Sequence, residues 1–168
     1  MKKIILLSFL ALALISCGSS RNVSKKRNTV RTISHKNHSV APKAQNIIEY
    51  AKSFEGTRYK FGGTTKRGMD CSGLVYTSFK NENIALPRVS RDMAKQGKRI
   101  SLREVEEGDL LFFQTNKSRR VINHVGLVVE SRKGAVKFIH STTSRGVIVS
   151  SLNERYWNNA FVEVRRVI

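Results

Sequence analysis

The sequence is poor in cysteine, proline and acidic residues, and these shortages exclude several classes of protein. Two cysteines in 168 residues are too few for a disulfide scaffold or a four-cysteine zinc site. Two prolines without a repeating period exclude collagen-like and repeat architectures. Hydrophobic residues make up 40% of the chain, which excludes global disorder. This length predicts one compact domain with short appendages.

The scarcity of acids leaves a large positive excess. The chain has 31 Lys and Arg against 12 Asp and Glu, a net charge of +19. Such a charge is typical of nucleic-acid-binding proteins, but no nucleic-acid motif is present and the N-terminus indicates export. We therefore expect no nucleic-acid partner. Envelope anions, such as lipid head groups and cell-wall polymers, fit the charge better, and a solvated basic surface without a specific ligand is the alternative.

Residues 1–16 have the pattern of a lipoprotein signal peptide. Lys2 and Lys3 precede an apolar run, 4–15, that is too short to span a bilayer. The run ends in Leu-Ile-Ser-Cys17, which resembles the bacterial lipobox and predicts a membrane anchor of acyl chains on Cys17. A simple secretory signal with a chance cysteine is the alternative. Because no Asp follows Cys17, we expect the outer membrane of a Gram-negative envelope, facing the periplasm.

The chain after the anchor divides into a tether and a domain. Residues 17–43 contain no acid and no apolar periodicity, which predicts a disordered basic tether. Residues 44–168 carry regular patterns. Helical spacing or capping predicts helices over 44–54, 70–81 and 90–96, the last with Ser90 as its cap. Strand patterns cover 110–113, 124–130, 135–140, 146–149 and 161–168, with a hairpin turn at Gly134. Helices followed by antiparallel strands predict an α+β fold.

Cys71 is the only thiol left once Cys17 is lipidated. Asp70 is a suitable N-cap, so Cys71 falls in the first turn of the helix over 70–81. The free backbone N–H groups and the dipole of the helix favour a thiolate and lower the thiol pKa, whereas the carboxylate of Asp70 opposes this shift. We therefore expect a reactive cysteine that needs a base. A small buried hydrophobe is the commoner role of a lone cysteine.

Several sequence blocks carry a family resemblance when they are taken in order. They are Tyr-Lys-Phe-Gly-Gly at 59–63, Met-Asp-Cys-Ser-Gly-Leu-Val at 69–75, Leu-Pro-Arg-Val-Ser at 86–90, Glu-Gly-Asp-Leu-Leu-Phe-Phe at 107–113, His-Val-Gly-Leu-Val at 124–128 and Phe-Ile-His-Ser at 138–141. Together with the terminal Arg-Arg-Val, 165–167, they resemble the NlpC family of papain-like cell-wall peptidases, and within it the single-domain murein endopeptidase lipoproteins. The resemblance covers nearly everything from Ala44 onward.

The resemblance implies a papain-like fold, with N-terminal helices packed on a central antiparallel sheet, and a catalytic triad. Cys71 is then the nucleophile, His124 the general base and acid, and His140 the group that orients His124. The remaining family positions imply an oxyanion donor and substrate contacts, with Arg88 equally suited to a structural role. These positions are Tyr59 for the oxyanion, and Asp70, Ser72, Ser90 and Arg88 for the substrate.

The segment between the two histidines is longer than is usual in the family. An odd number of extra residues would turn His140 to the opposite face of the sheet. Two histidines and one cysteine also suit zinc, but no carboxylate or third histidine stands in close register, so we expect no metal and no cofactor. The histidines at 35 and 38 fall in the tether.

The sequence therefore predicts a lipid-anchored, monomeric cysteine endopeptidase. Its substrate would be an amide of peptidoglycan stem peptides or cross-links, either a γ-D-glutamyl–diamino acid bond or a cross-bridge bond, cleaved through a thioester. Two alternatives stay open. One is an acyltransferase that uses the same Cys and His, and the other is a non-catalytic cell-wall-binding lipoprotein.

Overall fold

The computed structural model describes residues 41–116, 118 and 121–168. The predicted signal peptide, Cys17 and most of the predicted tether lie outside the described residues. Within the described ranges, no helix is long and apolar enough to cross a membrane. Helix α1 (Pro42–Lys52) begins two residues before the predicted domain boundary.

Three helices and a small hairpin form the first half of the domain. Helix α1 buries Ala44, Ile47, Ile48 and Ala51, which is the expected 3–4 spacing. Strands β1 (Thr64–Thr65) and β2 (Gly68–Met69) form a two-stranded hairpin, and α2 (Cys71–Asn81) follows directly. Helix α3 (Ser90–Met93) is shorter than predicted. The prediction of Ser90 as its cap is wrong, because Val89 occupies the cap position and no side chain caps the helix.

The second half of the domain is a six-stranded antiparallel sheet with the order β3-β8-β4-β5-β6-β7. The strands that the patterns predicted are all present, with small shifts at their ends. They are β4 (Leu110–Phe113), β5 (His124–Arg132), β6 (Ala135–Thr142), β7 (Gly146–Ser151) and β8 (Phe161–Arg166). The patterns missed β3 (Lys98–Ile100), the 3-10 turn Leu102–Glu104 and α4 (Arg155–Ala160).

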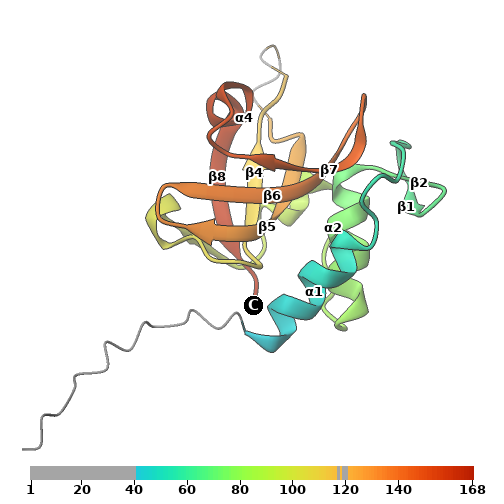
Figure 1. Cartoon of the computed structure of the whole chain (residues 1–168), viewed down its shortest axis with the longest axis horizontal. Coiled ribbons are helices and arrows are strands. Elements are labelled where there is room, and N and C mark those ends of the chain that lie inside the picture. Colours follow the sequence, from blue (N-terminus) through green and yellow to red (C-terminus); the bar gives the residue numbers. More distant parts are fainter. Residues whose placement is uncertain (1–40, 117, 119–120) are drawn as a thin grey trace, which may run out of the picture. The chain divides into compact units, whose positions relative to one another are not determined.

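The sheet separates two hydrophobic clusters. Helices α1 and α2 lie together beside the sheet, whereas α4 lies near β8 and β4 (Figure 1). Strand β4 is buried on both sides, since Leu110 and Phe112 belong to the helix cluster while Leu111 and Phe113 belong to the cluster that contains Trp157 of α4. This arrangement of helices on a mostly antiparallel sheet confirms the predicted α+β class.

Candidate active site

The first turn of α2 is held by the side chain of Asp70. Asp70 is the N-cap, and its Oδ1 accepts the N–H of Gly73 at 2.6 Å. Cys71 is therefore the first residue of the helix, as predicted. From β6, the Ser141 hydroxyl donates to the Met69 carbonyl at 2.8 Å, which ties the start of α2 to the strand that carries His140.

Arg88 is engaged inside the protein. Its guanidinium donates to both carboxylate oxygens of Asp70 at 2.9 Å, a bidentate pair, and also to the Ser72 hydroxyl at 2.8 Å. The Gly63 carbonyl accepts a fourth contact from Arg88 at 3.3 Å. Of the two roles that the sequence left open for Arg88, these contacts favour the structural one. The guanidinium is hydrogen-bonded to Asp70, the residue that caps α2.

The two histidines form a buried hydrogen-bonded chain that ends at a serine. Nε2 of His124 lies 2.9 Å from Nδ1 of His140, and Nε2 of His140 lies 3.0 Å from Oγ of Ser150. His140 is fully buried and Ser150 is 4% exposed. One proton arrangement suits catalysis: His140 donates to Ser150 and His124 donates to His140. It leaves Nδ1 of His124 as a lone pair that can take a thiol proton.

A bulge in β5 places the two histidines on one face of the sheet. The register pairs Leu127 with Ile139 and Val128 with Phe138, then shifts by one residue before Glu130 pairs with Lys137. Without that extra residue, the register at the hairpin end would turn His140 away from His124. The bulge therefore answers the question that the long segment between the histidines raised.

Trp157 of α4 packs against both histidines. Its ring stacks on His124 with centroids 5.1 Å apart and an interplanar angle of 21°, and it meets His140 edge-on at 4.5 Å. His124 also contacts Phe113. Both histidines thus face the cluster around Trp157, whereas Cys71 packs in the cluster on the other side of the sheet. His124 and Cys71 nevertheless line one cavity, because His124 is the first residue of β5 and lies at the end of the strand.

Burial has the largest effect on the pKa values of Cys71 and His124, and it overturns the expected low pKa of the thiol. Burial raises the pKa of Cys71, and the carboxylate of Asp70 raises it further. The backbone N–H groups of Val125, Ser72 and Cys71 itself point at the sulfur and lower the pKa, as the helix terminus predicts, but burial outweighs them. Burial lowers the pKa of His124 to about 4 and also depresses that of His140. These pKa directions favour a neutral thiol and a neutral imidazole over an ion pair when no substrate is bound.

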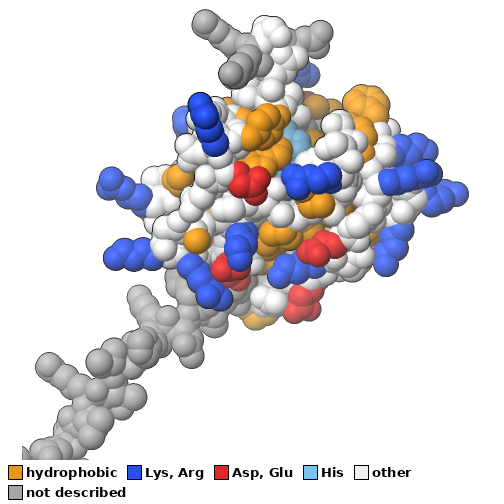
Figure 2. Space-filling view, turned by 45° about the horizontal axis from the view of Figure 1, so that its top comes forward, with side chains coloured by type: hydrophobic (Ala, Val, Ile, Leu, Met, Phe, Trp, Pro, Cys, Tyr) orange, Lys and Arg blue, Asp and Glu red, His pale blue; other side chains and the backbone are white. Residues whose placement is uncertain are grey.

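Two cavities flank Cys71. One, of about 440 Å³, contains His124, Trp157 and the turn between β6 and β7. The other, of about 650 Å³, contains Asp70, Ser72, Arg88 and Ser90, so the predicted substrate residues lie together on one side of Cys71. Tyr59 and Cys71 line both cavities. In the space-filling view, histidine is visible in a hollow between hydrophobic and basic side chains (Figure 2).

Tyr59 is held beside the start of α2 by a bridge to Met69. Burial raises the pKa of its hydroxyl, and the nearby groups of Cys71 and Asp70 raise it further, so the hydroxyl stays protonated and able to donate. Among the described residues, no three His, Cys, Asp or Glu side chains gather in a group that suits a metal ion.

Comparison with known proteins decides the family. The model of the NlpC/P60 family matches residues 56–166, which include every site residue described above. The chain belongs to the NlpC/P60 family. The resemblance that the sequence blocks carried is thereby confirmed.

Relatives and solved structures agree with the NlpC/P60 assignment. The chain is 38% identical over 123 residues to a murein DD-endopeptidase/murein LD-carboxypeptidase, MepS, of Escherichia coli, covering 73% of this chain and 62% of that protein. The chain thus spans less than two thirds of that relative's length. It is 36% identical to a probable endopeptidase of Haemophilus influenzae, covering 98% of both chains. A crystal structure of an NlpC/P60 protein from Bacillus cereus aligns with a TM-score of 0.68 at 29% identity, covering 76% of this chain and 41% of that one.

Sequence reasoning missed three residues of this NlpC/P60 site: Ser150, Trp157 and Arg145. Ser150 contacts His140, Trp157 stacks on His124, and Arg145 lines the cavity that contains His124. Ser150 follows Val149, where the predicted strand ended two residues before the observed end at Ser151, and serine in a strand carries no signal of its own. The single tryptophan was the one available clue to an aromatic wall, but its partners depend on tertiary packing.

Proposed function

We propose that this protein is a cysteine endopeptidase of peptidoglycan peptides. The observation that carries the proposal is the chain Ser150–His140–His124, which ends at a cavity shared with Cys71. The relatives named as a murein endopeptidase and, in Bacillus subtilis at 37% identity, as a γ-D-glutamyl-L-lysine dipeptidyl-peptidase support the substrate class.

The reaction begins with proton transfer from the neutral thiol. Nδ1 of His124 takes the thiol proton as the sulfur of Cys71 attacks the amide carbonyl. The C–N bond then breaks, and the imidazolium returns the proton to the leaving nitrogen, which leaves a thioester on Cys71. Water next attacks the thioester while His124 takes one of its protons. The acid product departs and the thiol is restored.

The oxyanion of the tetrahedral intermediate forms beside two donors. The hydroxyl of Tyr59 is one, since its raised pKa keeps it protonated. The backbone N–H of Cys71, at the start of α2, is the other. No carboxylate is hydrogen-bonded to the histidine chain in the described residues, so His140 and Ser150 disperse the imidazolium charge through hydrogen bonds rather than neutralise it.

The proposal includes the location of the enzyme. A signal peptide over 1–16 and acyl chains on Cys17 would tether the domain to the outer membrane, facing the periplasm, and the basic stretch to residue 43 would give it reach. The scissile bond would be a γ-D-glutamyl–diamino acid amide or a cross-bridge amide. The Escherichia coli relative is named for DD-endopeptidase and LD-carboxypeptidase activity, and the Bacillus subtilis relative for a γ-D-glutamyl bond.

The test is digestion of defined muropeptides by the wild-type chain and by Cys71→Ala, followed by mass spectrometry. We expect the wild type to form two products whose summed mass exceeds the substrate by one water, and the variant to form none while it melts as a folded domain. A product in which the acyl half is joined to an added amine would instead identify an acyltransferase. Binding without any product would identify a wall-binding protein, and cleavage by Cys71→Ala would refute the nucleophile.

A further inference from the structure

The two cavities beside Cys71 have different chemical roles, because only one of them contains His124. In the proposed reaction His124 protonates the nitrogen that leaves. The leaving amine must therefore lie on the side of the nucleophile where the imidazole is. The cavity with Asp70 and Ser72 then receives the acyl half of the substrate, and the cavity with His124 receives the amine half.

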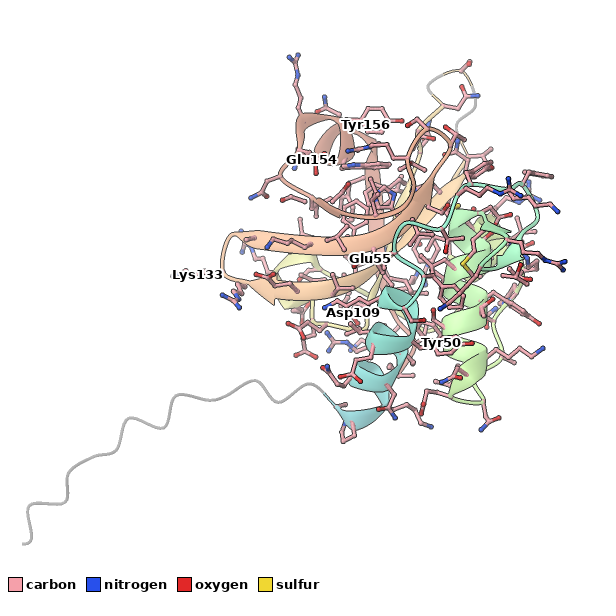
Figure 3. All side chains as sticks on the ribbon, turned by 45° about the vertical axis from the view of Figure 1, so that its right-hand side comes forward. Tyr50, Glu55, Asp109, Lys133, Glu154 and Tyr156 are labelled. Carbon is pink, nitrogen blue, oxygen red and sulfur yellow. The ribbon has the colours of Figure 1, made fainter. Side chains whose placement is uncertain are left out.

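The amine-side cavity is strongly polar and carries one arginine. Its lining includes Arg145 and its neighbours in the turn between β6 and β7, and Glu154 and Tyr156 from the region of α4. Figure 3 shows Glu154 and Tyr156 together at α4, far from Lys133 at the tip of the β5–β6 hairpin. The basic groups on that hairpin therefore do not contribute to this cavity.

Arg145 is exposed and forms no ion pair with any residue that the structure describes. Its position contrasts with that of Arg88, whose guanidinium is occupied by Asp70 and Ser72. Burial is the main cause of the lowered pKa of His140, and the charges of His124 and then Arg145 lower it further. Arg145 is thus a cation in the cavity that contains His124, without an ion-pair partner among the described residues, and the acid that shares its cavity is Glu154.

The turn that carries Arg145 is fixed to the rest of the domain. The N–H of Arg145 donates to the Thr142 hydroxyl at 3.0 Å. Gly146, which follows, has a φ of +66°, and a side chain there would collide with the Thr57 carbonyl. Val147 pairs with the same segment, since its N–H donates to the Thr57 carbonyl at 2.8 Å. The backbone therefore presents Arg145 to the cavity in a defined place.

We infer that Arg145 is a specificity residue that binds a carboxylate on the amino acid that supplies the leaving amine. This inference rests on the proposed function, and it assigns the amine side of the cleft to an anionic residue. A guanidinium suits a carboxylate because it can donate two parallel hydrogen bonds. In both kinds of scissile bond proposed above, the leaving amine can belong to a diamino acid, which carries such a carboxylate.

The test compares two synthetic peptides with the same acyl half of a stem peptide. Their leaving diamino acid carries either free carboxylates or the corresponding carboxamides. We expect the wild type to prefer the carboxylate peptide. Arg145→Gln should lower kcat/KM for that peptide about tenfold, which is the loss of one charge-assisted contact, and leave kcat/KM for the carboxamide peptide within about twofold. Arg145→Glu should reverse the preference.

Arg155→Gln is the matched control, because Arg155 is an exposed arginine of α4 that does not line the cavity. It should leave the ratio of the two kcat/KM values unchanged. If Arg145→Gln lowers kcat/KM for both peptides equally, or leaves the ratio of the two values as in the wild type, the inference is wrong while the peptidase activity stands. If the wild type cleaves neither peptide nor any muropeptide, the proposed function fails and the inference fails with it.

Discussion

Replacing Ser150 by alanine removes only the hydroxyl that contacts the end of the histidine chain. In the productive proton arrangement, Ser150 accepts the Nε2–H of His140 at 3.0 Å, and His140 in turn accepts the Nε2–H of His124. Without the hydroxyl, that N–H is buried without an acceptor. The other tautomer of His140 then buries only a lone pair, which costs less. In that tautomer His140 donates to His124, and the remaining proton of His124 occupies Nδ1, the atom that must accept the thiol proton.

The structure sets the size of this effect. A hydrogen bond between neutral groups contributes about 0.5–1.5 kcal/mol net, and about 1.4 kcal/mol corresponds to a tenfold change in an equilibrium. We therefore expect Ser150→Ala to lower kcat about two- to twelvefold. KM should change little, because the side chain at position 150 lines neither of the two cavities beside Cys71. The free energy of unfolding should fall by about 1–3 kcal/mol if the N–H stays unpaired.

The assay measures kcat and KM on one defined muropeptide, together with the rate of Cys71 alkylation. Ser150→Thr retains the hydroxyl and should retain most of the activity. Ser78→Ala is the structural control, because the buried Ser78 hydroxyl donates to the Leu74 carbonyl at 2.8 Å, outside the site. That variant should lose stability without losing kcat. A Ser150→Ala protein with wild-type kcat would show that the serine does not select the histidine tautomer.

Three further predictions follow from the burial and charge of the site. Alkylation of Cys71 by iodoacetamide should keep rising above pH 8, because burial raises the thiol pKa; a plateau below pH 7 would instead reveal a thiolate–imidazolium pair. The free energy of unfolding should fall as the pH drops from 6.5 to 4, because His124 and His140 bind protons in the unfolded chain at a higher pH than in the folded domain. His124, with its folded pKa lowered to about 4, contributes about 3 kcal/mol of this fall and His140 adds to it; a flat urea-denaturation series would contradict this. Asp70→Asn should cost about 2 kcal/mol in urea denaturation by leaving Arg88 unpaired, whereas a cost near zero would show that the bidentate contact contributes little.

Local patterns in the sequence were sufficient for much of the fold. The start of α2 at Cys71 follows from Asp70, because an N-cap side chain accepts a backbone N–H from the first turn of the helix that comes directly after it. Strand β4 follows from four consecutive large apolar residues. Strand β3 was beyond local prediction, because it is short and basic and exists through its pairing with β8, more than sixty residues later.

The candidate site divides in the same way. Neighbours in the chain determined the N-terminal placement of Cys71 and the strand that begins at His124, since caps and alternation act over a few residues. Only the tertiary structure decided which face His140 occupies, because that depends on one bulged residue in β5. It also decided the direction of the thiol pKa, because burial by packing from distant segments outweighs the backbone N–H groups that the sequence places at the sulfur. Long-range packing alone likewise brings Ser150 and Trp157 to the histidines, and no local rule contains that information.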